Sequence, residues 1–362
     1  MKYLRTIVAL LAGAALCTRG VAAASSTKVV TENRFNEWIN GTPRSVHVEP
    51  DDVLRLGGDV VRTAAFAFAA LDAVAYDGTA TWYVAVGSTV LACEPGSSNQ
   101  VALRFESERA TALAYGPDGL LYVGATPGGV VYRRERNGNL TRVADTGQRY
   151  IWVLRFVDPN TLLAGTGPNG IVCAIDLSIA PPQCSVLFDS AEENVTALAL
   201  QGRAIIAGTA PRGRIYRIES ATSVFALVET KTAEVTSLHC DPDGTIWAAT
   251  MGGVPAVPTA TALSPSIPQQ GMLTGGVVTS SVAPTLPEAQ RAKLNDDSGA
   301  TLLVIGSNGF VETYWRSPES ALCGLTRGAD GTLYAGSGNR GRVYALRGRG
   351  RAALVVQVAS RQ

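Results

Sequence analysis

Short apolar runs separated by polar turns fill most of this chain, and the same order of runs returns about every 40 residues. Each unit opens with an apolar run, such as residues 195–200, and a tight turn rich in Asp, Pro and Gly follows it. A second apolar run then leads into a Gly-rich loop, and a third run alternates apolar and polar residues. This pattern predicts an all-β fold, a β-propeller with four strands in each blade.

The turns and loops of the repeat support the same interpretation. Gly116-Pro-Asp-Gly119 and Asp241-Pro-Asp-Gly244 suit tight turns between strands, because Pro presets one backbone dihedral and Gly accepts a positive φ. The Gly-rich loop follows the spacing Gly-x-x-Pro-x-Gly or a close variant. It occurs at residues 124–129, 165–170, 208–213 and 336–341.

The repeats set the expected number of blades. A further hairpin is predicted within residues 45–61, where it could supply outer strands that close the ring. The ring then has six blades with an extra N-terminal hairpin, or seven with one incomplete, and we favour six. The six repeats span residues 71–105, 110–147, 151–189, 195–228, 235–317 and 321–358.

The N-terminus predicts export. Two basic residues precede an apolar run at residues 7–17, and small residues follow, which is the order of a secretory signal peptide. The run is short for a bilayer-spanning helix, and no later segment is long and apolar enough to cross a membrane. We expect a periplasmic or secreted protein. Lipoprotein anchoring at Cys17 is disfavoured, because Leu16 stands where a small residue is normally required.

One long segment interrupts the repeats. It is rich in Pro, Ser and Thr, has no strand or helix period, and falls between the second and third strands of the fifth blade. It is either a lid or partner-binding loop or a tolerated insertion. The chain therefore divides into a signal peptide (1–24), an N-terminal segment with the ring-closing hairpin (25–61), blades one to mid-five (62–252), the insertion (253–299) and the remainder of the propeller (300–362).

Five of the six cysteines lie beyond the signal peptide. Cys173 and Cys184 fall on two strands joined by the Pro-rich turn at residues 180–182, and facing positions of a hairpin bring side chains within bridging distance. In an exported protein they form either a disulfide or two buried free thiols.

Taken together, the Asp-Pro-Asp-Gly turn, the strand ending in Gly-Thr, the Pro-x-Gly loop and the x-Tyr-Arg strand resemble a known group. They look like exported bacterial β-propellers related to NHL and gluconolactonase-like propellers, over residues 70–250 and 300–358. The resemblance implies a propeller fold. It does not imply one activity, because this superfamily includes scaffolds, ligand binders, and metal-dependent lactonases and lyases.

Propeller lactonases hold a divalent cation with carboxylates and an Asn around the central channel. Here the channel-lining register carries no carboxylate, so we expect no metal, no cofactor and no catalytic residue. Arg155 and His239 are its two strongly polar members. They form either a small site for an anionic ligand or hydrogen bonds between blades. The register is read as Ala75, Ala114, Arg155, Ala199, His239 and Thr326.

Candidate binding residues gather on the face that the Gly-rich loops share with the connections between blades. Arg, Tyr and Trp that converge on a concave rim suit recognition of a partner, although ordinary solvated loops would carry the same residue types. On this face and in the adjoining channel, the candidates are Arg149, Tyr150, Trp152, Arg155, Asn169, Arg212, His239, Asn339 and Arg340.

The formal net charge of +1 gives no reason to expect nucleic-acid binding. We therefore expect an exported, monomeric, non-catalytic propeller that binds a protein or small ligand on its loop face. Two alternatives are left open. One is a channel-sited enzyme of lactonase or lyase type, and the other is a structural remnant of a longer propeller protein.

Overall fold

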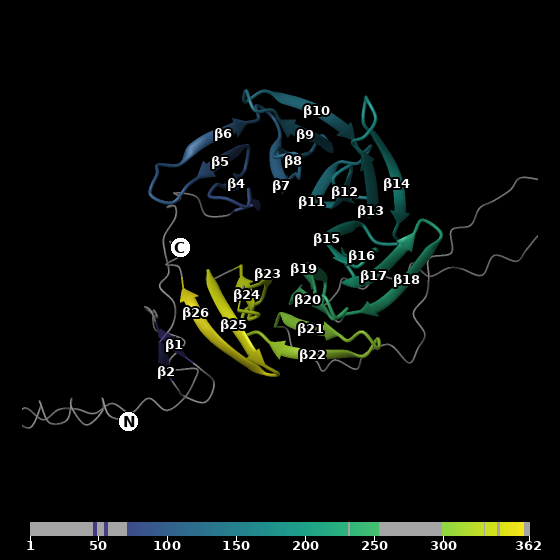
Figure 1. Ribbon diagram of the computed structural model, residues 1–362. Helices are drawn as coiled ribbons and strands as arrows, with labels where there is room; N and C mark the ends of the chain where they lie inside the picture. The colour runs from purple at the N-terminus through teal and green to yellow at the C-terminus, as the bar shows by residue number, and fades with distance from the viewer. Residues whose placement is uncertain are drawn as a thin grey trace, which may run out of the picture.

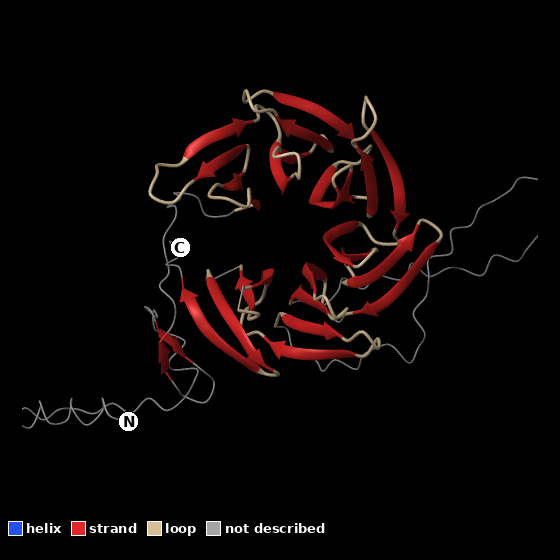
Figure 2. Ribbon diagram, in the orientation of Figure 1, coloured by secondary structure: helices blue, strands red, loops and turns tan. Residues whose placement is uncertain are grey.

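The structure is a computed structural model that describes residues 71–230, 232–252, 299–328, 330–338 and 341–357, together with two short strands near the N-terminus. The regular elements of this part of the chain are all β-strands, arranged as a ring around a central axis (Figures 1 and 2). A search of the same residues for a helix long and apolar enough to span a membrane found none.

Six four-stranded antiparallel blades form the ring, which confirms the prediction of a six-bladed propeller. In each blade the first strand lies nearest the axis and the fourth lies at the rim (Figure 1). Blade 1 comprises β3 (Ala73–Tyr76), β4 (Trp82–Val86), β5 (Thr89–Cys93) and β6 (Gln100–Arg104). Blade 2 comprises β7 (Arg109–Tyr115), β8 (Leu121–Thr126), β9 (Val130–Arg134) and β10 (Leu140–Asp145). Blade 3 comprises β11 (Tyr150–Asp158), β12 (Thr161–Gly167), β13 (Ile171–Asp176) and β14 (Gln183–Asp189).

The second half of the ring follows the same order. Blade 4 comprises β15 (Asn194–Gln201), β16 (Ala204–Ala210), β17 (Arg214–Ser220) and β18 (Ser223–Glu229). Blade 5 comprises β19 (Glu234–Cys240), β20 (Ile246–Met251), β21 (Thr301–Ile305) and β22 (Val311–Arg316). Blade 6 comprises β23 (Leu322–Arg327), β24 (Leu333–Ser337), β25 (Arg342–Gly348) and β26 (Arg351–Gln357).

An N-terminal hairpin forms where the sequence predicts one, from β1 (Val46–Val48) and β2 (Leu54–Leu56). It extends blade 6 at the rim, where Val48 lies opposite Leu354 of β26. Blade 1 supplies all four of its own strands, so the hairpin does not join blades 1 and 6 into one sheet.

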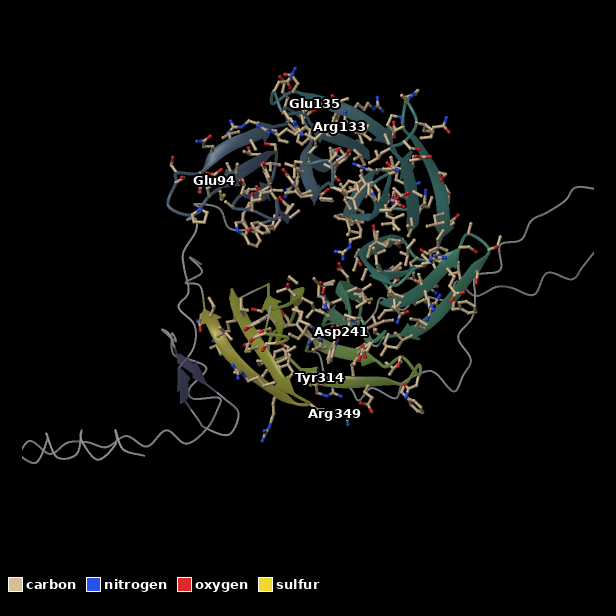
Figure 3. All side chains as sticks on the ribbon, viewed as in Figure 1. Glu94, Arg133, Glu135, Asp241, Tyr314 and Arg349 are labelled. Atoms are coloured by element: carbon tan, nitrogen blue, oxygen red, sulfur yellow. The ribbon has the colours of Figure 1, made fainter. Side chains whose placement is uncertain are left out.

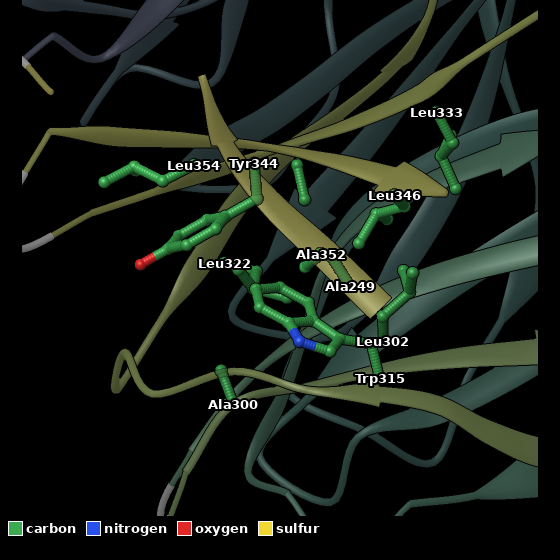
Figure 4. Close-up of a cluster of buried hydrophobic side chains, with 11 residues drawn as sticks. Ala249, Ala300, Leu302, Trp315, Leu322, Leu333, Tyr344, Leu346, Ala352 and Leu354 are labelled. Carbon is green, nitrogen blue, oxygen red and sulfur yellow. The ribbon is translucent and has the colours of Figure 1, made fainter. Parts of the chain in front are cut away.

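Burial between sheets holds successive blades together. Five hydrophobic clusters are each shared by two neighbouring blades, from the junction of blades 1 and 2 to that of blades 5 and 6. At the last of these junctions, Trp315 of β22 and Tyr344 of β25 pack at a ring-centroid distance of 5.0 Å (Figure 4). The near-continuous apolar runs of second strands such as β8, β12 and β16 produce this arrangement, because successive side chains point to opposite faces of the sheet and make both faces apolar.

The Gly-rich loop has a fixed role. Gly213 has a φ of +57°, and a Cβ atom at this position would lie 2.4 Å from the carbonyl oxygen of Thr232. The loop between the second and third strands therefore packs directly on the connection to the next blade, and only Gly permits that approach. Loops and connections share one end of the ring, here called the loop face. The opposite end carries the turns between first and second strands and is called the turn face.

Residues 1–45, 57–70 and 253–298 lie outside the described residues, and with them the predicted signal peptide, Cys17 and the insertion. Asn339 and Arg340 also lie outside them.

Candidate functional site

Every first strand from blade 2 onward has a β-bulge at the equivalent place, near its start. The bulge falls between Ala110 and Ala112 in blade 2, and it recurs in β11, β15, β19 and β23. A bulge re-aims the side chain of the extra residue. The five bulge residues are Thr111, Trp152, Thr196, Thr236 and Cys323.

Three of these residues are threonines, and all three join their blade to the next. The hydroxyl of Thr111 donates to the carbonyl oxygen of Ile151 at 2.6 Å, and that of Thr196 donates to Val235 at 2.7 Å. Thr236 makes the same bond to Leu322. The position therefore has a structural role in blades 2, 4 and 5.

Blade 3 departs from this rule. Its bulge residue is Trp152, whose indole Nε1 donates to Oδ1 of Asn194 in blade 4 at 2.8 Å. A Cβ on Gly167 would lie 2.1 Å from that Oδ1 and 2.8 Å from the indole nitrogen. The local backbone thus makes room for the Trp152–Asn194 pair, and the bond fixes the orientation of the ring.

Trp152 is the end of a short stack at the loop-face mouth of the channel. Its ring lies 5.2 Å from that of Tyr150 at an interplanar angle of 23°, and the guanidinium of Arg149 lies 5.4 Å from the Tyr150 centroid. The Trp152 side chain remains 37% exposed. A pre-oriented aromatic surface of this kind offers contact area at low entropic cost. Three of the predicted loop-face residues therefore lie side by side, and their role in binding stays a prediction.

Arg212 and Asn169, the two other predicted loop-face residues within the described part of the chain, contact neighbouring segments. Arg212 forms an ion pair with Glu192 at 2.9 Å, and Glu192 also lies 3.5 Å from Arg214. Burial raises the pKa of Glu192, and the two guanidiniums oppose that shift. The backbone N–H of Asn169 donates to the side chain of Gln148 at 3.3 Å. Arg212 therefore belongs to a packed connection between blades 3 and 4.

The predicted channel residues Arg155 and His239 do not bond to each other. Arg155 on β11 is exposed, and no hydrogen bond or ion pair to it occurs among the described residues. The Nε2 atom of His239 lies 3.3 Å from Oδ1 of Asp241, at the turn-face end of β19.

Asp241 is the centre of a cluster that the sequence analysis missed. Its carboxylate accepts hydrogen bonds from the indole of Trp247 at 2.7 Å and from the guanidinium of Arg327. Asp241 and the neighbouring Tyr314 are labelled in Figure 3. Arg327 also lies 5.8 Å from the Trp247 ring centroid, and Tyr314 packs edge-on against that ring. Aligning the first strands by register would have found the cluster, because Arg327 stands where blades 2 to 4 have the apolar residues Tyr115, Phe156 and Leu200.

The described cysteines are free thiols. Cys184 pairs in register with Ile175, and Cys173 pairs with Val186, so the two cysteines lie diagonally across the strand pair and not face to face. Their interaction raises the pKa of Cys173 and lowers that of Cys184. The disulfide alternative is therefore not realised, because the register is two residues away from the facing arrangement that it needs. Among the residues described, no group of three His, Cys, Asp or Glu side chains could hold a metal ion.

Comparison with known proteins supports the fold. No family model matches the chain, and no curated protein matches it. Among solved structures, virginiamycin B lyase from Staphylococcus aureus has a TM-score of 0.57 at 10% identity, over 81% of this chain and 86% of that one. One chain of a nidogen/laminin complex has a TM-score of 0.50 at 10% identity, over 73% and 88%.

A third neighbour is the extracellular domain of the putative one component system BT4673 from B. thetaiotaomicron, with a TM-score of 0.50 at 12% identity. The match covers 81% of this chain and 34% of that longer chain, so this chain spans about a third of its length. At these identities the likeness concerns the propeller fold alone. The finer resemblance to NHL and gluconolactonase-like propellers stays a prediction.

Proposed function

We propose that this protein is an exported, non-catalytic β-propeller that binds a ligand or protein partner on its loop face, around Tyr150 and Trp152. The observation that carries the proposal is the exchange at the bulge position. Three blades use a threonine there to join their neighbour, whereas blade 3 presents a half-exposed tryptophan in a stack with Tyr150.

Trp152 joins blade 3 to blade 4 through Asn194, as the threonines join their blades, and in addition it leaves a rigid aromatic surface that a partner can desolvate. Asn194 holds the indole in place, so little conformational entropy is lost on binding. The basic and apolar start of the chain supports export. Among the neighbours, the extracellular BT4673 domain and the nidogen/laminin complex are consistent with a binding role outside the cell.

Site-specific photo-crosslinking in the producing cells tests the proposal. A photoreactive amino acid replaces Tyr150 in one variant and Phe225 in a control, because Phe225 is an exposed aromatic on the outer strand of blade 4. We expect a discrete adduct from position 150 and none from position 225. The adduct should disappear when Trp152→Thr is added. Equal labelling at the two positions, or an adduct that Trp152→Thr leaves intact, contradicts the proposal.

A channel-sited enzyme is the second candidate, and one observation favours it. His239 faces the carboxylate of Asp241, and a carboxylate on one ring nitrogen orients an imidazole for proton transfer at the other. A panel of lactones offered to the purified protein tests this alternative. Turnover that His239→Gln abolishes would support it, and turnover that the variant keeps would exclude His239 as the base.

A further inference from the structure

Arg155 occupies an unusual place for an arginine. It lies on β11, the strand of blade 3 nearest the axis, and its side chain is exposed. No hydrogen bond or ion pair satisfies its guanidinium within the described part of the chain. Arg342, a buried arginine at the junction of blades 5 and 6, differs from Arg155 in this respect, because it forms an ion pair with Glu319 at 3.1 Å. Arg155 is thus a free cation at the wall of the channel.

His239 lies at the same level of the ring. Arg155 pairs with Leu163 and His239 pairs with Trp247, and these partners stand at the same distance from the bulge in blades 3 and 5. Asp241 contacts one nitrogen of His239, and no hydrogen bond to Nδ1 occurs among the described residues. The second ring nitrogen of His239 is therefore available to a ligand.

The charge of Arg155 also bears on the strand that carries His239. Burial raises the pKa of the Cys240 thiol to about 11, and the charge of Arg155 acts against that shift. Cys240 follows His239 directly in β19. The guanidinium of blade 3 therefore acts on the end of β19 in blade 5, where His239 lies.

A purely structural role does not account for the pair. Hydrogen bonds between blades were one prediction for Arg155 and His239, but a different pair joins blades 5 and 6 at this end of the ring, namely Arg327 and Asp241. That pair is neutral in sum. Among the described residues Arg155 has no charged partner, it stands at the same register level as His239, and it is exposed.

We propose that the turn-face end of the channel is a second binding site, in which Arg155 and His239 hold a small anion that carries a phosphate or carboxylate group. The planar guanidinium offers two parallel donors to such a group. His239 adds a third contact through Nδ1, and its Nε2 lies 3.3 Å from the Asp241 carboxylate. This site is separate from the proposed loop-face function, because it lies at the opposite end of the first strands.

Histidine NMR gives a direct test, because the chain has two histidines, His47 and His239. The full-length protein labelled with ¹⁵N-histidine is titrated with inorganic phosphate at about pH 6, near the ordinary pKa of histidine. The variant His47→Gln assigns the signals. We expect a saturable shift of the His239 signal with a dissociation constant of about 1 mM or below. A second titration with succinate tells a phosphate preference from a carboxylate preference, and saturation by either anion supports the site.

Matched variants decide whether Arg155 carries the binding. Arg155→Met should weaken anion binding at least about tenfold. Arg155→Lys should restore part of the affinity, since lysine keeps the positive charge but lacks the two parallel donors of the guanidinium. Arg149→Met, which removes an arginine at the other mouth, should leave the titration unchanged, as should Trp152→Thr. A shift that fails to saturate with both anions overturns the proposal. So does an affinity that Arg155→Met leaves unchanged. The crosslinking experiment at position 150 does not involve Arg155 or His239, so the loop-face proposal and this one are tested separately.

Discussion

Val74 in blade 1 and Leu198 in blade 4 occupy the same place in their sheets, yet Val74 is 49% exposed and Leu198 is 5% exposed. Both lie on the first strand, on the face that turns toward the preceding blade. Leu198 packs into the cluster shared with blade 3. Val74 faces blade 6, and no hydrophobic cluster of the described residues joins blades 6 and 1.

The whole exposed face of blade 1 shows the same contrast. Tyr76 and Trp82 stack on each other at 4.5 Å and remain more than two-fifths exposed, and Val101 is more exposed still. The opposite face of the same sheet is buried against blade 2. The repeat therefore determines the shape of a blade, whereas its neighbour determines how much of that blade is buried.

The largest effect is expected from the buried ion pair at a closed junction. The side chains of Glu319 and Arg342 are 3% and 4% exposed, and the carboxylate also accepts from the Tyr344 hydroxyl. Glu319→Ala removes a buried carboxylate from both a buried guanidinium and a buried hydroxyl, so it should cost about 4 kcal/mol of unfolding free energy. Urea denaturation measures the loss. Asp145→Ala, which breaks the exposed pair with Arg142, should cost less than about 1 kcal/mol, and equal losses would refute the contrast.

Truncation of the two matched apolar residues tests the comparison directly. Leu198→Ala should destabilise the protein by about 3 kcal/mol, because it opens a cavity in a closed junction. Val74→Ala should cost less than about 0.5 kcal/mol, because half of that side chain already contacts solvent. The midpoints of urea denaturation provide the measurement, provided that the unfolding free energy of each variant depends equally steeply on urea concentration. A large loss from Val74→Ala would mean that the face of blade 1 is covered in solution.

The hydrogen bonds from the bulge threonines to the next blade, here called threonine ties, should have a smaller effect on the free energy of unfolding. Thr196→Val removes the donor to the Val235 carbonyl and should cost about 1–2 kcal/mol. Cys323 holds the same bulge position in blade 6, so Cys323→Ala should stay within about 0.5 kcal/mol of the parent. The two variants are compared by thermal and urea unfolding. Losses of similar size would show that blade 6 is tied to another segment through this position.

The smallest effect on stability is expected at the binding surface. Trp152→Thr restores the residue that blades 2, 4 and 5 carry, so the unfolding free energy should change by less than about 1 kcal/mol. Crosslinking at position 150 should nonetheless be lost. A stability loss as large as that of Leu198→Ala would indicate that Trp152 serves the fold and not a partner.

Much of the architecture could be predicted from the pattern of the chain. Turns such as Asp241-Pro-Asp-Gly244 recur at a regular interval, and recurrence over several units outweighs the ambiguity of any single strand. The count of six blades and the shared end for loops and connections followed from the same repeat. Arg149, Tyr150 and Trp152 lie close together because they are near neighbours at one strand start, whereas their role in binding stays a prediction.

Other features depend on register and contact, which a sequence does not display. In the hairpin of β13 and β14, Cys184 lies two residues away from the position that faces Cys173, and the bulge and turn of this hairpin determine that register. Asp241 lies in a turn of blade 5, Trp247 on β20 of the same blade and Arg327 on β23 of blade 6, and their meeting depends on the angle between the two sheets. The openness of blade 1 toward blade 6 is likewise a property of the assembled ring.

Each threonine tie has an acceptor that belongs to the main chain of the following blade, and every amino acid provides that oxygen. Such an inter-blade hydrogen bond requires a hydroxyl group in one blade and no particular side chain in the next. Whole units can therefore be copied, exchanged or individually specialised without matched changes on the other side. The tryptophan of blade 3 is an instance of such specialisation, in which a single unit acquired a new surface while its neighbours kept the common joint.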